Sequence, residues 1–124
     1  MELKDIHKEI LALCADDDTG FWLILKRVAK DAYSFDKLPE WVRPGTLEVI
    51  RYLLQNGFIE AGNFDVKDSG GFIFRPMSVS TNEVISYIER EWDELEKPPN
   101  IGDICWFRAT PAGEKLARDL GLTV

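Results

Sequence analysis

Histidine and cysteine are scarce in this sequence, which has one of the first and two of the second among its 124 residues. Every serine–histidine or cysteine–histidine catalytic arrangement would have to use His7, and the sequence places no nucleophile beside it. Dinucleotide- and triphosphate-binding loops are missing as well. We therefore expect no catalytic residues and no cofactor, and a protein that is not an enzyme.

Clustered metal ligands are also missing from the sequence. Residues 16–18 are three aspartates, but they match only fragments of a calcium loop, so we interpret them as a connection that caps the next helix. Cys14 and Cys105 lie far apart in apolar patterns, which favours buried thiols over a disulfide or a metal site. For His7, which borders the apolar stripe of the first helix, we expect a surface or boundary position.

Long apolar runs do not occur. The apolar runs, such as residues 21–25, fall far short of the roughly 18 residues that a membrane span needs. The first ten residues alternate charged and apolar side chains and have no signal-peptide core. We expect a cytoplasmic protein with one domain over residues 1–124 and no membrane association.

Positive charge is the other scarcity, since the chain has a net charge of −7. Non-specific binding to nucleic acid depends on lysine and arginine at the phosphates, and no basic cluster is present. The negative charge is concentrated in residues 80–96, where six acidic residues accompany one arginine. DNA is therefore the less favoured partner.

Apolar residues at helical spacing predict helices over residues 3–15, 20–33, 46–56, 80–96 and 110–120. Thr46 is the predicted N-cap of the third helix and Asn56-Gly57 its end, while Ser80 and Glu83 form a capping box. We expect segments 57–62 and 103–108 to pair as antiparallel strands, with a turn-rich ribbon over residues 63–79. The predicted core includes Trp22, Leu25, Leu54, Ile88 and Trp106.

Two segments resemble the winged helix-turn-helix superfamily of bacterial regulators. The sequence LLQNGFIEAG (residues 53–62) is similar to the helix that precedes the wing in MarR-like and PadR-like families. FRATPAGEKLARDL (residues 107–120) is similar to the last wing strand and the following helix. The resemblance implies a mainly helical α+β fold with a small antiparallel sheet. Here the two wing strands would be separated by an inserted region, residues 63–102, which contains a whole helix.

The resemblance also implies which residues would face DNA in a dimeric transcriptional regulator: Glu48, Arg51, Tyr52 and Gln55. That face is electrically neutral and carries one arginine. The helix over residues 80–96 instead carries an acidic ridge, Glu89, Asp93 and Glu96. We therefore expect a winged-helix-like protein-interaction module, of an immunity or regulatory type, that binds a basic protein through this ridge. The alternative is the DNA-binding regulator, and a homodimer is a further possible assembly.

Overall fold

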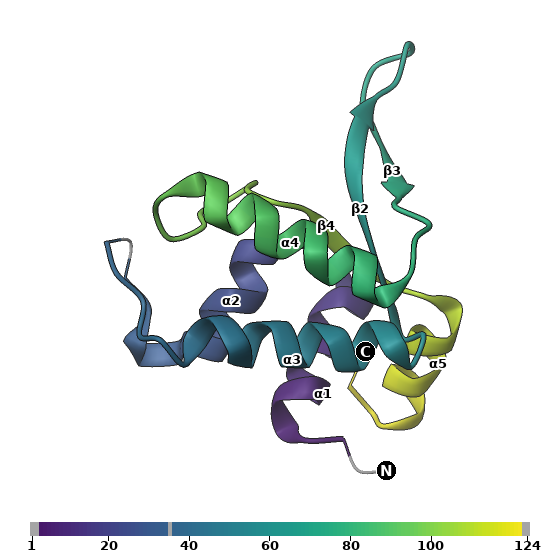
Figure 1. The fold of residues 1–124 in the computed structure, drawn as a ribbon. Helices are drawn as coiled ribbons and strands as arrows, with labels where there is room; N and C mark the ends of the chain where they lie inside the picture. Colours follow the sequence, from purple (N-terminus) through teal and green to yellow (C-terminus); the bar gives the residue numbers. More distant parts are fainter. Residues whose placement is uncertain (1–2, 35, 123–124) are drawn as a thin grey trace.

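The computed structural model describes residues 3–34 and 36–122 of the chain. Over these residues, helices pack on a small antiparallel sheet, which confirms the expected α+β class (Figure 1). The elements are, in chain order, α1 (Asp5–Asp16), β1 (Thr19–Gly20), α2 (Phe21–Ala29), the 3-10 turn η1 (Lys30–Ala32), α3 (Val42–Gln55), β2 (Ile59–Val66), β3 (Phe72–Pro76), α4 (Thr81–Leu95), β4 (Trp106–Ala109) and α5 (Pro111–Asp119).

The described strands form one sheet in the order β1-β4-β2-β3, and every neighbouring pair is antiparallel. Ile59 at the start of β2 lies opposite Ala109, and Gly62 lies opposite Trp106. The prediction that segments 57–62 and 103–108 pair antiparallel is therefore confirmed. Because β1 pairs with the other side of β4, β4 is central in the sheet.

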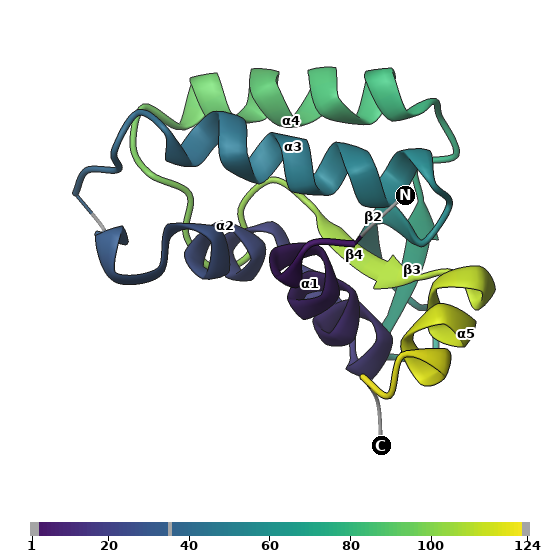
Figure 2. The same cartoon turned by 90° about the horizontal axis from the view of Figure 1, so that it is seen from below.

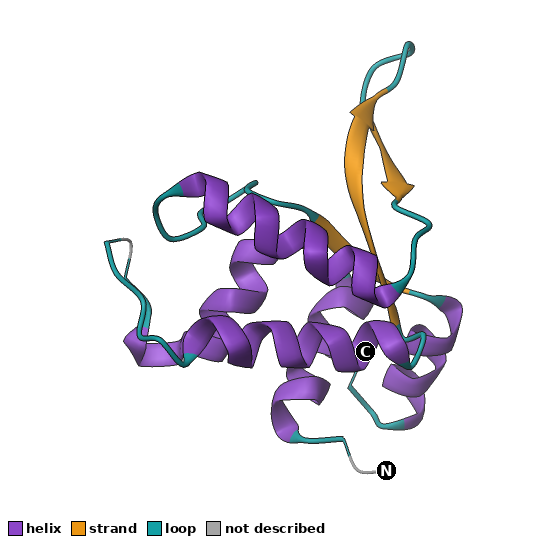
Figure 3. Cartoon of the chain, viewed as in Figure 1, coloured by secondary structure: helices purple, strands orange, loops and turns teal. Residues whose placement is uncertain are grey.

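β2 continues past β4 and forms a hairpin with β3 that stands away from the helices (Figure 3). The sequence had predicted only a turn-rich ribbon here. Gly70 and Gly71 at the tip have φ angles of 89° and 80°, a conformation that other residues adopt only with strain. The hairpin is thus a two-stranded extension of the central sheet.

α3 lies in the middle of the helical layer, with α4 along one side and α1 and α2 on the other (Figure 2). α5 packs against α1 and β4. The N-cap predicted for α4 is confirmed, because the Ser80 hydroxyl accepts a hydrogen bond from the Glu83 amide at 3.2 Å. The Glu83 carboxylate accepts from the Ser80 hydroxyl at 3.1 Å, in place of the main-chain amide that a capping box would use. None of the described helices combines the length and apolarity that a membrane crossing requires.

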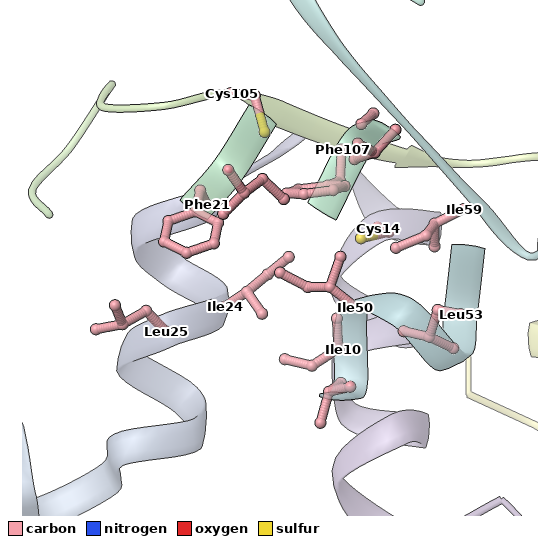
Figure 4. Close-up of a cluster of buried hydrophobic side chains, with 14 of the residues drawn as sticks. Ile10, Cys14, Phe21, Ile24, Leu25, Ile50, Leu53, Ile59, Cys105 and Phe107 are labelled. Carbon is pink, nitrogen blue, oxygen red and sulfur yellow. The ribbon is translucent and has the colours of Figure 1, made fainter. Parts of the chain in front are cut away.

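The core lies between the helices and one face of the sheet (Figure 4). Phe107 on β4 and Phe21 on α2 are its largest fully buried side chains. Ile24, Ile50 and Leu53 pack in the same buried cluster. The alternate residues of β4 and β2 that face this cluster are all buried, so the sheet has one inner face and one outer face.

The predicted core list is right in two cases and wrong in three: Leu25 and Ile88 are buried, and Trp22, Leu54 and Trp106 are half-buried. α3 is rotated by one residue from the expected orientation, so Leu53 is fully buried in place of Leu54. Trp22 stays at the rim of the core, where its indole N–H donates to the Tyr33 hydroxyl at 2.6 Å. The N–H of an indole needs a hydrogen-bond partner, which favours such a position at the rim of the core.

Thr46 is not an N-cap, because α3 begins four residues earlier, at Val42. The Thr46 side chain is fully buried inside the helix, and its hydroxyl donates to the Val42 carbonyl oxygen at 2.8 Å. Pro44 does not interrupt the helix. It lies in the first turn, where a helix needs no amide donor, so the helix passes through it.

Candidate functional site

Two of the four α3 residues expected to face DNA contact neighbouring helices. Arg51 donates from its guanidinium to the Asn82 side-chain oxygen at 2.6 Å, and Asn82 lies in the first turn of α4. The Tyr52 ring stacks on His7 of α1, with 4.2 Å between the ring centroids. Glu48 and Gln55 are exposed. The one cation of this face is therefore held against α4.

The acidic ridge predicted on α4 is exposed at all three positions, Glu89, Asp93 and Glu96. Part of it is in contact with α3. Arg43 donates to an Asp93 carboxylate oxygen at 2.7 Å and to the Glu89 main-chain oxygen at 3.2 Å. Its guanidinium also lies 5.0 Å from the centre of the Trp92 ring. Arg43 thus neutralises the middle of the ridge and joins the two helices.

An apolar surface that sequence reasoning missed lies on the side of the sheet that faces away from the core. Residues directly opposite in an antiparallel pair share a face, and so do alternate residues along a strand. The register therefore gathers several apolar side chains on one surface. We call it the outer sheet face: Phe64, Val66, Phe72, Phe74 and Trp106.

The outer sheet face is uncovered toward the hairpin tip. Val66 is 74% exposed and Phe72 is 68% exposed. The Phe64 ring meets Phe74 and Trp106 edge to face, with centroid distances of 5.7 Å and 5.3 Å. A contiguous exposed apolar patch of this kind marks an interaction site more often than scattered exposed apolar residues do.

One glycine and one arginine hold the Phe74 ring of this face in place. A Cβ on Gly62 would lie 2.7 Å from the Phe74 ring and 2.4 Å from the Arg75 main-chain oxygen, so no larger residue fits. The Arg108 guanidinium lies 4.3 Å from the centre of the Phe74 ring, and Arg108 donates to Glu60 at 2.7 Å. Phe74 is therefore covered, while the hairpin residues beyond it are not.

The signal for this face was present in the sequence as alternation. Phe72 and Phe74 are separated by one residue, as are Phe64 and Val66, which is the spacing of side chains on one face of a strand. Sequence reasoning assigned Trp106 to the core because the run around it is continuously apolar. In the structure Phe107 takes the inner position and Trp106 the outer one.

His7 is buried, with 5% of its surface exposed, so the expected surface or boundary position is wrong. Its Nδ1 accepts a hydrogen bond from the Lys4 amide at 3.1 Å. Burial is the largest influence on the pKa of His7 and lowers it; Lys4 lowers it further, and Glu48 opposes them. The ring is therefore held neutral, with a structural role between α1 and α3.

We predict that this histidine makes stability depend on pH. Its ordinary pKa is 6.5, and a folded-state pKa below that means that the unfolded chain binds the proton more readily. The stabilisation is complete above pH 6.5 and is lost as the pH falls toward the folded-state pKa. We compare the unfolding free energy of the wild type with that of His7→Phe. As the pH is lowered from 6.5, the wild-type value minus the variant value should decrease, by at most about 1.4 kcal/mol per pH unit. A difference that stays constant from pH 7.5 to 5.0 in urea titrations would contradict the prediction.

The cysteines and carboxylates do not assemble a reactive centre among the described residues. Cys14 and Cys105 are buried and unpaired, as predicted, and burial raises the pKa of each thiol to about 12. A thiol of this kind is a poor nucleophile at neutral pH. Within residues 3–34 and 36–122, no three histidine, cysteine or acidic side chains come together as a metal site.

A groove of about 540 Å³ separates the hairpin from α4. Tyr87 and Arg90 line it, and the Arg90 guanidinium lies 5.7 Å from the Tyr87 ring centre. Burial raises the pKa of the Tyr87 hydroxyl, which donates to the Ile104 main-chain oxygen at 3.3 Å. Glu83 also lines the groove, but its carboxylate accepts a hydrogen bond from the Ser80 hydroxyl at the start of α4. These groups are committed to local structure.

The chain matches no protein-family model, and neither the curated proteins nor the solved structures include one similar to it. The function therefore has to be argued from the residues described above.

Proposed function

We propose that this chain is a non-enzymatic, winged-helix-like module that binds a basic protein partner, with the outer sheet face as the contact surface. The exposure of Val66 and Phe72 beside a rigid aromatic cluster carries the proposal. Burying such residues against a partner is favourable by roughly 25 cal/mol for each Å² of apolar surface removed from water. The net charge of −7 favours a basic partner and increases the rate of association.

The order of the elements supports the winged-helix part of the proposal. β4 lies between β1 and β2, and the paired strands β2 and β4 follow α3 and precede α5. This is the arrangement expected from the two segments that resemble MarR-like and PadR-like regulators. The outer half of the hairpin and α4 then occupy the inserted region, residues 63–102.

The contacts of α3 favour a protein partner over DNA. In a DNA-reading winged helix this helix would lie in the major groove, and its side chains would have to reach base edges. Here α4 lies beside it and Asn82 engages Arg51, the only cation among the four residues. The acidic ridge on α4 would add repulsion toward phosphates.

A DNA-binding measurement separates the two candidate functions. Purified protein should bind random and sequence-selected duplexes weakly or not at all at physiological salt, because counterion release is small. Fluorescence anisotropy with labelled duplexes measures this directly. Nanomolar binding of a selected duplex that disappears in Arg51→Ala would establish the DNA-binding regulator instead.

Partner capture tests the surface itself. The wild type should retain a partner protein from a native lysate, and the double variant Val66→Ser with Phe72→Ser should not. The partner, once purified, should bind the purified wild type directly. The matched control is Glu89→Lys with Asp93→Lys, which changes the acidic ridge and leaves the outer sheet face intact. The control should slow association mainly at low salt, since added ions screen this attraction. Equal capture by the serine variant and the wild type would rule out the outer sheet face as the contact surface.

A further inference from the structure

β3 is an open edge of the sheet in the described part of the chain. Two main-chain hydrogen bonds flank its pairing with β2: Lys67 N–H to the Gly71 oxygen at 3.0 Å, and Met77 N–H to the Ala61 oxygen at 2.9 Å. Hydrogen-bonded pairs alternate along an antiparallel ladder. The main-chain groups of the intervening odd-numbered residues of β3 are therefore those that point toward β2.

The even-numbered residues of β3 consequently direct their main-chain groups toward solvent. Phe72 and Phe74 each offer an N–H and a C=O at the open edge, and Pro76 offers a C=O alone. Such an edge accepts another strand readily. Both sides of the strand are also apolar at this point, because Phe72 is 68% exposed on one side and Ile73 is 41% exposed on the other.

We propose that β3 pairs with β3 of a second copy of this chain, antiparallel, about a twofold axis that lies between the two Phe74 residues. The two Phe74 residues then exchange both of their outward hydrogen bonds. Each Phe72 N–H donates to the Pro76 carbonyl oxygen of the other copy, which is the acceptor that remains there. This pairing satisfies every outward amide of β3 and continues the outer sheet face from one copy into the other.

The side-chain pattern of β3 favours a second copy as the occupant. In this register Ile73 lies opposite Arg75 of the other copy, so no like charges face each other. Arg75 is already paired with Asp65 of its own chain, which leaves it without net repulsion toward the neighbouring strand. A strand of another sequence would have to show apolar residues on the outer sheet face and tolerate Arg75 on the opposite side, and β3 itself has this pattern.

The assembly closes at two copies. The opposite edge of the sheet is β1, which has two residues and is too short to pair with a further strand. Pro76 has no amide, so the ladder between the copies ends at that residue. A twofold contact that uses one edge of each chain gives a dimer rather than a fibre.

Two substitutions at one position test the pairing. Ile73→Lys places a lysine opposite Arg75 of the second copy, and Ile73→Glu places a carboxylate there. Within one chain Ile73 lies opposite Asp65, so the lysine should stabilise the hairpin of a single chain and the glutamate should destabilise it. Sedimentation equilibrium should show that the wild type is a dimer. Ile73→Lys should raise the dissociation constant of this dimer roughly tenfold or more, because two symmetric pairs change together. Ile73→Glu should leave the dissociation constant equal or lower it.

Hydrogen exchange provides a second measurement that needs no variant. The Phe72 and Phe74 amides should be protected in the wild type at high concentration and lose that protection on dilution. A monomeric wild type at millimolar concentration would overturn the proposal, and so would equal weakening of the dimer by both substitutions. Neither result would bear on the partner-capture experiment, because this contact requires only the purified chain.

Discussion

Gly113→Ala should cost about 3 kcal/mol or more of stability, because a side chain at this position overlaps main-chain atoms. A Cβ on Gly113 would lie 1.9 Å from the Phe58 carbonyl oxygen and 2.8 Å from its carbonyl carbon. Neither atom can rotate away as a flexible side chain could. The same oxygen accepts a hydrogen bond from the Thr110 amide at 3.1 Å, so the first turn of α5 is fixed against the start of β2. Relief would require α5 to move and would uncover Ala117, which is fully buried.

Gly45→Ala is the matched control for this substitution. Gly45 also lies inside a helix, α3, but a Cβ there would meet only the Val28 side chain, at 3.5 Å. Replacing a helical glycine by alanine without a clash should stabilise the protein by about 0.5–1 kcal/mol. Urea unfolding followed by circular dichroism measures both variants. A Gly113→Ala stability within about 0.5 kcal/mol of the wild type would show that α5 does not pack as described.

Phe107→Ala should cost about 3–5 kcal/mol, the usual range for removing a buried aromatic ring. Phe107 is fully buried on the inner face of β4, between the strands β1 and β2 (Figure 4). The surrounding side chains come from several helices and strands, so the cavity can collapse only in part. Phe72→Ala removes the same atoms from an exposed position and should change stability by less than about 0.5 kcal/mol in dilute, monomeric protein. Equal losses in the two variants would contradict the inner and outer assignment of the sheet.

Local signals predicted the N-cap of α4 and the pairing of β2 with β4, but they placed the start of α3 four residues too late. Thr110 accepts a hydrogen bond from the Gly113 amide at 3.1 Å and precedes Pro111, the first residue of α5. These caps depend on residues three or four positions apart, which a sequence displays directly. The pairing of β2 with β4 was predictable because each strand adjoins an apolar helix and cannot bury its face alone.

The orientation of individual side chains could not be predicted from the sequence. Leu53 and Leu54 are adjacent and chemically identical, so a rotation of α3 by one residue changes which of them is buried without changing the apolar pattern. Ile104 to Phe107 form a continuous apolar run, and such a run does not say which alternate residues face inward. Tertiary packing determines which of these side chains are buried.

The contacts of the candidate site were unpredictable for a related reason. Arg43 reaches Asp93 across fifty positions in the sequence, and Arg51 reaches Asn82 across thirty-one. No local rule connects residues so far apart. The contact between Arg43 and the acidic ridge, and the position of α4 beside α3, were therefore not anticipated.

The double pairing of β2 has an evolutionary consequence. Its first residues pair with β4 and its last with β3, and Gly62 is the one described residue paired with both Trp106 and Pro76. The part of the hairpin beyond Gly62 can therefore lengthen or shorten without changing the core. Changes of two residues in each strand would preserve which side chains share a face, whereas a change of one would exchange the two faces. Selection can thus vary the reach of the hairpin in paired steps while the rest of the domain stays the same.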